Sequence, residues 1–263
     1  MIDRRRVGAV ARRQFVVMRR SLPKWFDMTL WPLLDVVLWG SLGAFAASGT
    51  NASRTSAPYL LAGIILFHVM FQTQMALCNG FLEETWTSNL LNVMTTPVTE
   101  IEYALGLALY SLAKLAMGVT AVAVGAWAFF RFDITSVGWV VVPICAVLLL
   151  SGWAISQVAI GLVLRFGPSA EVVMYGIVFL TLAVSGVFNP IAALPGVLQP
   201  VGRVLPTSHA FAALHAELRG DGIAWAQLGL GLAGAVVASL LGTAFVVHQL
   251  AVFRRRGYVT RFS

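Results

Sequence analysis

Apolar residues run along this chain in long blocks separated by short polar stretches. A helix needs about 20 mostly apolar residues to cross the hydrocarbon layer of a bilayer. Six blocks meet or approach this length: residues 28–48, 58–80, 101–130, 138–165, 171–188 and 223–250. The pattern therefore predicts an all-α polytopic membrane protein with six transmembrane helices, folded as one membrane domain over residues 1–263.

Composition agrees with this fold class. Hydrophobic residues make up 59% of the 263 residues and charged residues only 11%, against about 25% charged residues in soluble domains. So few charges cannot cover a soluble surface, and they also exclude a disordered chain and a nucleic-acid-binding domain. The net charge of +7 sits mainly at the two ends, because eight of the 18 basic residues lie within residues 1–24 and four within 254–261.

The positions of the basic residues predict how the chain faces. Six spans place both termini on one side. The stretches on that side hold 13 basic residues (1–27, 81–100, 165–170, 251–263), and those on the other side hold four (49–57, 131–137, 189–222). Basic loops stay in the cytoplasm, so we expect both termini to be cytoplasmic. The 16 Arg against two Lys suggest a GC-rich bacterial genome, and hence a bacterial cytoplasmic membrane.

Two segments outside the spans have helical patterns of their own. Residues 1–24 combine an apolar stripe with seven arginines, which predicts an interfacial amphipathic helix among anionic lipid head groups. Residues 189–222 carry four prolines at short intervals between apolar pieces. They predict short re-entrant outer helices before the last span, packed on the other helices.

The loop at 81–100 is acidic although it is predicted to be cytoplasmic. With the first residues of the next span (101–102) it contains four glutamates and no basic residue, and its apolar residues share one helical face. The residues that define its two faces are Glu83, Glu84, Trp86, Leu90 and Val93. Such a helix suits docking to a basic groove on another protein, and a solvated loop without a partner is the alternative. Thr99 and Glu102 then have the spacing of a capping box that opens the third span.

Polar side chains inside the spans are candidates for function. His68, Gln72 and Asn79 recur on one face of the second span, which we expect to face the bundle or a pathway. Hydrogen bonding that only holds the helices together is the alternative. Asp35 and Lys114 lie at similar depths in the first and third spans, which predicts an intramembrane ion pair. Snorkelling of Lys114 towards the interface competes with that pairing.

Motifs for enzyme chemistry are missing from the sequence. It has no zinc-binding His-Glu-x-x-His helix, no Gly-x-Ser-x-Gly turn and no cluster with metal-ligand spacing. Lys24 and Lys114 follow Pro23 and Ala113, so neither completes a phosphate-binding Gly-Lys loop. We therefore expect that this chain binds no cofactor and no metal and is not itself an enzyme.

Two local motifs and their order along the topology resemble a known family. Residues 90–99 (Leu-Leu-Asn-Val-Met-Thr-Thr-Pro-Val-Thr) and 205–210 (Leu-Pro-Thr-Ser-His-Ala), the latter followed by Leu218 and Arg219, are similar to stretches of the type-2 integral membrane permeases of ABC exporters. The resemblance covers almost the whole chain. It implies a permease subunit that pairs with a second copy or a paralogue, a homodimer in the first case.

The same resemblance implies where ATP is used. A separate ABC ATPase subunit would bind ATP and Mg, and residues 81–96 would form the coupling helix seated in it. The substrates implied are amphipathic or hydrophobic drugs, lipids or glycans moved outwards, as in efflux. Two alternatives remain open: an ATPase-independent transporter or channel, and an intramembrane enzyme using Asp35, His68 and Glu171.

Overall fold

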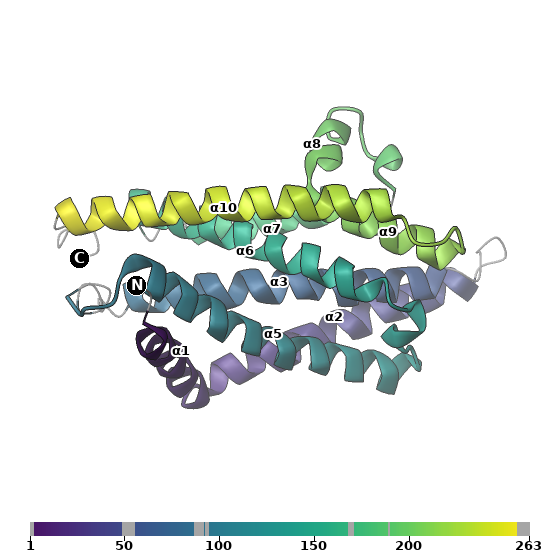
Figure 1. The fold of residues 1–263 in the computed structure, drawn as a ribbon. Helices are drawn as coiled ribbons and strands as arrows, with labels where there is room; N and C mark the ends of the chain where they lie inside the picture. Colours follow the sequence, from purple (N-terminus) through teal and green to yellow (C-terminus); the bar gives the residue numbers. More distant parts are fainter. Residues whose placement is uncertain are drawn as a thin grey trace.

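The structure is a computed structural model that describes residues 3–48, 56–86, 92, 95–167, 171–188 and 190–256. These residues form helices and turns and contain no strand. Figure 1 shows the long helices running lengthwise along one elongated bundle, with α1 near the end that holds both termini. In chain order the elements are α1 (Arg4–Arg19), α2 (Leu22–Ser48), α3 (Ser56–Trp86), α5 (Glu100–Phe130), η1 (Ile134–Val137), α6 (Val141–Phe166), α7 (Glu171–Val184), η3 (Ile191–Ala193), α8 (Gln199–Val204), α9 (Pro206–Arg219) and α10 (Trp225–Arg256).

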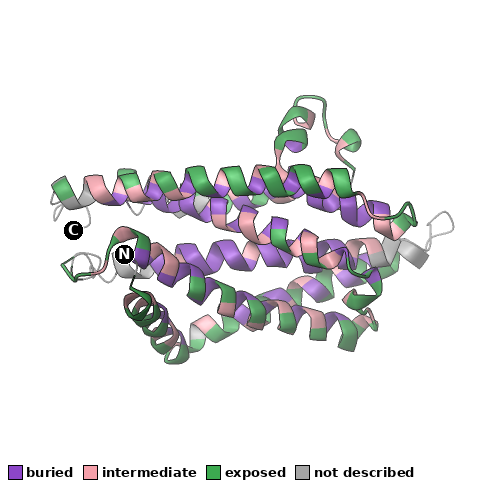
Figure 2. Ribbon diagram, viewed as in Figure 1, coloured by how far each residue is buried: buried purple, intermediate pink, exposed green. Residues whose placement is uncertain are grey.

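Helix α3 forms the centre of the bundle. Every residue from 61 to 70 is buried, and α3 packs against α2, α5 and α6. Figure 2 shows this central burial beside the largely exposed α10. The outer faces of α2 and α10 are apolar, and their side chains Trp31, Leu38, Leu240 and Leu241 are all more than half exposed. Apolar faces of this size are stable in lipid or against another protein, and not in water.

Within the part of the chain that the structure describes, five helices are long and apolar enough to cross a membrane. They contain the segments Lys24–Phe45, Tyr59–Leu82, Glu100–Phe130, Val141–Phe166 and Trp225–Val252. The chain is therefore a multi-pass membrane protein built of helices. Both termini lie near the same end of the bundle (Figure 1), so the chain travels along its length an even number of times.

The expected fifth span is shorter than the sequence pattern predicts. Helix α7 ends at Val184 after 14 residues, which is about 21 Å of helix against about 30 Å of hydrocarbon. The prediction of a span over 171–188 is wrong at its C-terminal end. Ser185 and Gly186 form a turn there, and Gly186 has a φ of +77°, a conformation that glycine adopts without steric cost.

The expected second span is longer than predicted. Helix α3 continues without a break to Trp86, so the separate helix expected from residue 81 does not begin there. Apolar side chains stay buried as far as Phe81 and Leu82, and packing therefore supports the helix beyond the predicted end at residue 80. The first span also begins earlier, since α2 starts at Leu22 and holds Pro32 inside it.

Glycines allow the close approach of several helix pairs. A Cβ on Gly152 of α6 would overlap the Met70 carbonyl oxygen of α3. In α10, a Cβ on Gly242 would lie 2.8 Å from Gln157 Oε1, and one on Gly234 would lie 3.2 Å from Pro206 Cγ. These two glycines of α10 are thus used for packing within the chain.

Helix α9 packs against both α6 and α10. Pro206 occupies its first position, where the missing N–H is not needed. Gly220 ends it in the left-handed conformation at φ +80°. These two residues fix the direction in which the chain enters α10.

Candidate functional site

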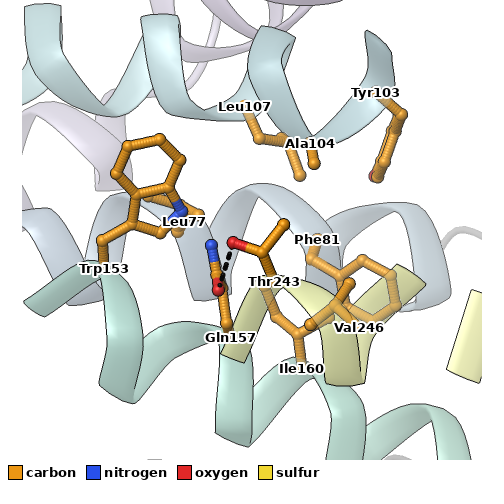
Figure 3. A pocket seen from close by; sticks show the side chains of 10 residues that line it. All are labelled: Leu77, Phe81, Tyr103, Ala104, Leu107, Trp153, Gln157, Ile160, Thr243 and Val246. Carbon is orange, nitrogen blue, oxygen red and sulfur yellow. Dashed lines mark hydrogen bonds between the residues drawn. The ribbon is translucent and has the colours of Figure 1, made fainter. Parts of the chain in front are cut away.

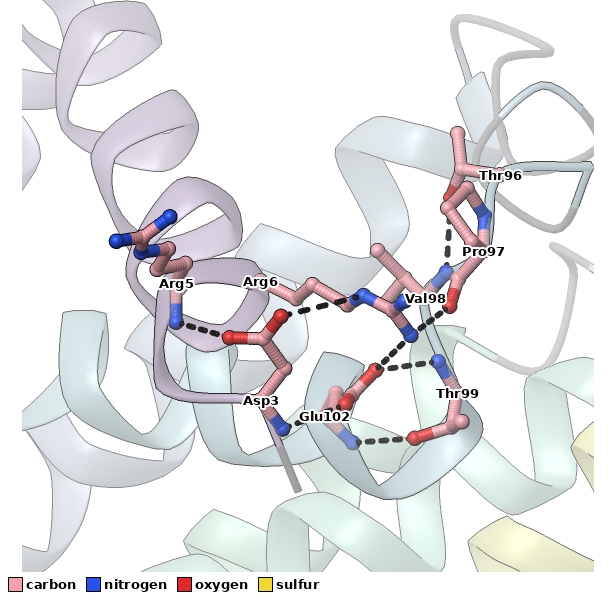
Figure 4. A network of polar contacts seen from close by, with 8 residues as sticks. All are labelled: Asp3, Arg5, Arg6, Thr96, Pro97, Val98, Thr99 and Glu102. Atoms are coloured by element: carbon pink, nitrogen blue, oxygen red, sulfur yellow. Dashed lines mark hydrogen bonds and ion pairs between the residues drawn. The ribbon is translucent and has the colours of Figure 1, made fainter. Parts of the chain in front are cut away.

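The N-terminus of α1 is fastened to the start of α5 by a buried carboxylate, as Figure 4 shows. Glu102 Oε1 accepts the backbone N–H of Asp3 at 2.8 Å, and Oε2 accepts the N–H of Thr99 at 2.9 Å. Arg6 Nη1 lies 3.6 Å from Oε2 and donates to the Pro97 carbonyl at 2.6 Å. We name this set of residues, Asp3, Arg6, Pro97, Thr99 and Glu102, the N-terminal clamp.

The local sequence explains why the clamp forms. Thr99 and Glu102 make the predicted capping box, with the Glu102 N–H donating to Thr99 Oγ1 at 3.3 Å, so this prediction is confirmed. Asp3 caps α1 by accepting the Arg5 N–H at 2.8 Å. The Glu102 side chain is fully buried although it is charged. A buried carboxylate is stable only with such donors, and the clamp therefore holds one fixed geometry.

Helix α1 is held along its length as well as at its start. Gln14 Nε2 donates to the Gly80 carbonyl of α3 at 3.2 Å, and Phe15 meets Tyr110 of α5 edge to face at 5.2 Å. A Cβ on Gly106 would overlap the Val10 side chain. The helix is thus part of the bundle, and its predicted position in the lipid interface stays a prediction.

The predicted docking segment, residues 81–96, lies next to this clamp along the chain. Glu83, Glu84 and Trp86 fall in the last turns of α3, where the structure describes the backbone but not their side chains. Leu90 and Val93 lie outside the described residues. A groove of about 310 Å³ opens between α1 and the described residues of this segment, and Arg13 is its basic lining residue.

The polar face of α3 enters the middle of the bundle. His68 and Gln72 are each 1% exposed, and Asn79 is partly buried. Gln72 packs on Gly118 of α5, where a Cβ would lie 3.1 Å from the Gln72 Cδ. Gln72 Nε2 has no hydrogen-bond partner among the described residues. A buried amide of this kind is costly in a membrane interior, so this position is a candidate for contact with water or substrate.

Asp35 of α2 pairs with His68 of α3. The distance from Asp35 Oδ2 to His68 Nε2 is 3.3 Å, and His68 Nδ1 lies 2.8 Å from the Ile64 carbonyl oxygen. A carbonyl oxygen only accepts, so Nδ1 carries a proton, and Nε2 has no hydrogen-bond partner among the described residues. Lys114 is buried in α5 at 3% exposure, and its pairing with Asp35 stays a prediction.

A small cavity separates α3, α5, α6 and α10, and Figure 3 shows the side chains around it. Its volume is about 20 Å³, which is room for one water molecule. Trp153 Nε1 lines it and has no hydrogen-bond partner among the described residues. Thr243 Oγ1 lies 2.9 Å from Gln157 Oε1 and joins α10 to α6.

Helix α9 carries two histidines with different surroundings. His209 Nδ1 lies 2.6 Å from Gln227 Oε1 of α10. His215 is 4% exposed and stacks on Tyr59 of α3 with ring centroids 3.7 Å apart. Burial, with a smaller contribution from Arg219, lowers the pKa of His215 from 6.5 to about 4, so this side chain stays neutral at neutral pH.

Several of these residues were missed by sequence reasoning. Asp3 and Arg6 carried a signal only as part of a basic stretch, and nothing in the sequence linked them to Glu102. Trp153 and Thr243 lie in apolar helices where tryptophan and threonine are ordinary. Glu171, considered for an enzyme site with Asp35 and His68, has no described side chain. The described residues contain no group of His, Cys, Asp and Glu that could hold a metal ion.

Comparison with protein families matches residues 5–218 to the ABC-2 type transporter family. The chain belongs to this family. The matched residues run from α1 to the last turn of α9 and include the Asp35–His68 pair and all of the N-terminal clamp except Asp3. No curated protein matches the chain.

Membership of the ABC-2 family defines the class of function. The family is the membrane component of ABC transporters, and it generally works with an ABC ATPase subunit. This ABC-2 protein is accordingly a membrane component of a transporter. The resemblance inferred from the two sequence motifs is confirmed.

Proposed function

We propose that this chain is the permease subunit of an ATP-driven exporter in a bacterial cytoplasmic membrane. It moves an amphipathic or hydrophobic substrate outwards and pairs with a second copy of itself or a paralogue. An ABC ATPase binds ATP and Mg on a separate chain. In this proposal the chain crosses the membrane six times and both termini lie in the cytoplasm. The fifth crossing is made by α7 together with the short helices that follow it, because α7 alone is too short.

The observation that carries the proposal is the rigid connection between the docking segment and the bundle core. Helix α3 runs unbroken from Trp86 to the buried His68 and Gln72. The segment after α3 returns to α5 through Pro97 and Thr99, which the N-terminal clamp fastens to α1. A force applied by an ATPase near Glu83 would therefore move α3, α5 and α1 together.

Differential contacts in two states are needed for such coupling. ATP binding would draw two ATPase subunits together and displace the docking segments with them. The polar face of α3, including His68, Gln72 and Asn79, would then change its access to the two sides of the membrane. Substrate would enter from the cytoplasm or the inner leaflet and leave outwards.

Gentle purification of the tagged chain tests the proposal. The full chain should retain an ATP-binding subunit, and the double variant Trp86→Ala with Glu83→Gln should insert normally but lose much of that subunit. The matched control is Trp139→Ala with Asp133→Asn, a tryptophan and an acid in the exposed connection between α5 and α6 at the other end of α5.

Equal retention of the ATPase by both double variants would remove the docking role from residues 81–96. A wild-type chain that never retains an ATP-binding subunit would instead favour a transporter that works without an ATPase. Transport assays in vesicles then separate the two cases, because only the exporter stops when ATP hydrolysis is blocked.

A further inference from the structure

A half-exposed carboxylate lies in the middle of an otherwise apolar span. Asp35 sits midway along the span Lys24–Phe45, and its side chain is 43% exposed, whereas its partner His68 is 1% exposed. Leu38 and Leu42 beside it on α2 face outwards. An exposed charge at this depth is costly in plain lipid and marks a cavity, a pathway or a contact.

Two indole rings bracket this carboxylate. Trp31 and Trp39 stand four residues before and four residues after Asp35, so all three share one side of α2. Trp31 is 63% exposed, and Trp39 is partly buried and stacks on Phe188 with ring centroids 4.1 Å apart. The face of an indole ring attracts cations, as a carboxylate does.

We propose that Asp35, Trp31 and Trp39 form a subsite for the cationic group of an amphipathic substrate. His68 is a positioning residue in this subsite: its Nδ1 is fixed by the Ile64 carbonyl, and its Nε2 lies 3.3 Å from Asp35 Oδ2 at the edge of the α2–α3 contact. The apolar side chains around Asp35 would cover the hydrophobic part of the substrate. This inference rests on the proposed function and names its substrate class.

A substrate cation suits this site better than a second copy of the chain does. A second copy would have to present an exposed Lys or Arg at the same depth. Within the interior of the described spans the one Lys or Arg is Lys114, which is 3% exposed. The carboxylate and the two rings therefore have no complementary charge on the described outer faces of this chain, and a cationic ligand supplies one.

Two probes of equal size and opposite charge test the proposal. The full chain in lipid nanodiscs is titrated with tetraphenylphosphonium, a hydrophobic cation, and with tetraphenylborate, the matching anion, and empty nanodiscs give the lipid background. We expect saturable binding of the cation only. Asp35→Asn should weaken it by about tenfold or more, and Trp31→Leu by about two- to fivefold. Asp35→Glu keeps the charge and should keep most of the binding.

The control variants are Asp221→Asn and Trp139→Phe, an exposed acid and an exposed tryptophan outside the spans, and both should bind like the wild type. The proposal is overturned if the cation does not saturate, if the anion binds equally, or if Asp35→Asn binds as the wild type does. It is also overturned if the cation does not bind and Asp35→Asn instead breaks a cross-linked dimer. The assay uses no ATPase, so its failure is distinct from failure of the chain to retain an ATP-binding subunit.

Discussion

The contact between α3 and α6 gives a prediction whose size follows from the structure. Gly152 of α6 touches the backbone of α3, and a Cβ there would overlap the Met70 carbonyl oxygen and lie 3.1 Å from Thr73 Cβ. Because Met70 O is a backbone atom, it cannot swing aside as a side chain can. Gly152→Ala therefore forces the two helices apart, by about 1 Å if an ordinary carbon contact is to be restored.

The expected cost has two parts. Overpacking a close contact costs about 1–3 kcal/mol. Alanine offsets up to about 1 kcal/mol of this, because it favours a helix more than glycine does. We expect a net loss of about 1–2 kcal/mol in the free energy of unfolding, which lowers the melting temperature of a chain of this size by about 2–8 °C.

Thermal unfolding in detergent, followed by the loss of helical circular dichroism, measures this effect. The matched control is Gly229→Ala in α10, where a Cβ would meet nothing within 4 Å. That variant should melt at or slightly above the wild-type temperature. If Gly152→Ala melts no lower than Gly229→Ala, α3 and α6 do not approach each other this closely. In that case the contact with α6 does not hold α3 rigid.

Three further predictions concern polar contacts. Glu102→Gln removes a charge and one acceptor from the N-terminal clamp, so trypsin should cut the arginines of α1 faster than in the wild type, and an unchanged cleavage rate would refute the clamp. Burial lowers the pKa of His215 from 6.5 to about 4 in the folded chain, so the unfolded chain takes up a proton at a higher pH than the folded chain does. The free energy of unfolding should therefore fall by about 3 kcal/mol in total as the pH drops from about 6.5 to 4. In the variant His215→Phe the melting temperature should depend less on pH over that range. Thr243→Val removes the contact with Gln157 and should cost about 0.5–1 kcal/mol in thermal unfolding, whereas Thr120→Val, whose hydroxyl bonds only within α5, should change little.

Local signals in the sequence predicted local structure well. The capping box at Thr99 and Glu102 forms as expected, because its partners are three residues apart and need no tertiary information. The third span, expected over 101–130, matches α5 within one residue at its start. Hydropathy also identified the long apolar helices, since the bilayer requires the same composition wherever they pack.

Features that depend on packing were predicted less well. Hydropathy ended the second span at residue 80 because of the glutamates that follow, although a helix does not stop where its polarity changes, and α3 continues to Trp86. The fifth span was predicted too long because its apolar run continues through Ser185 and Gly186, which form a turn. In both cases the error comes from taking the ends of an apolar block as the ends of a helix.

The surroundings of Asp35 show what counting residues along the helices cannot predict. Counting residues along each helix gave similar depths for Asp35 and Lys114 and so predicted a pair. Depth alone leaves the rotation of each helix about its axis undetermined. The structure places Asp35 beside His68 of α3, a neighbour that residue counting did not identify, and the pairing with Lys114 stays a prediction. The N-terminal clamp was missed for a similar reason. Asp3 and Glu102 are 99 residues apart, and only the packing of α1 on α5 brings them together.

The continuity of α3 links the two ends of the proposed mechanism. About 22 Å of unbroken helix separates Glu83 from His68, and the buried surroundings of α3 leave it little freedom to bend between them. A displacement of the docking segment would thus arrive at the Asp35–His68 pair as a movement of the whole helix, without a chain of separate side-chain rearrangements. Asp35 belongs to α2 and the docking segment adjoins α3, so any sliding of α3 against α2 changes the contact between Asp35 and His68. The cation subsite therefore stands at a contact that such a movement of α3 would alter.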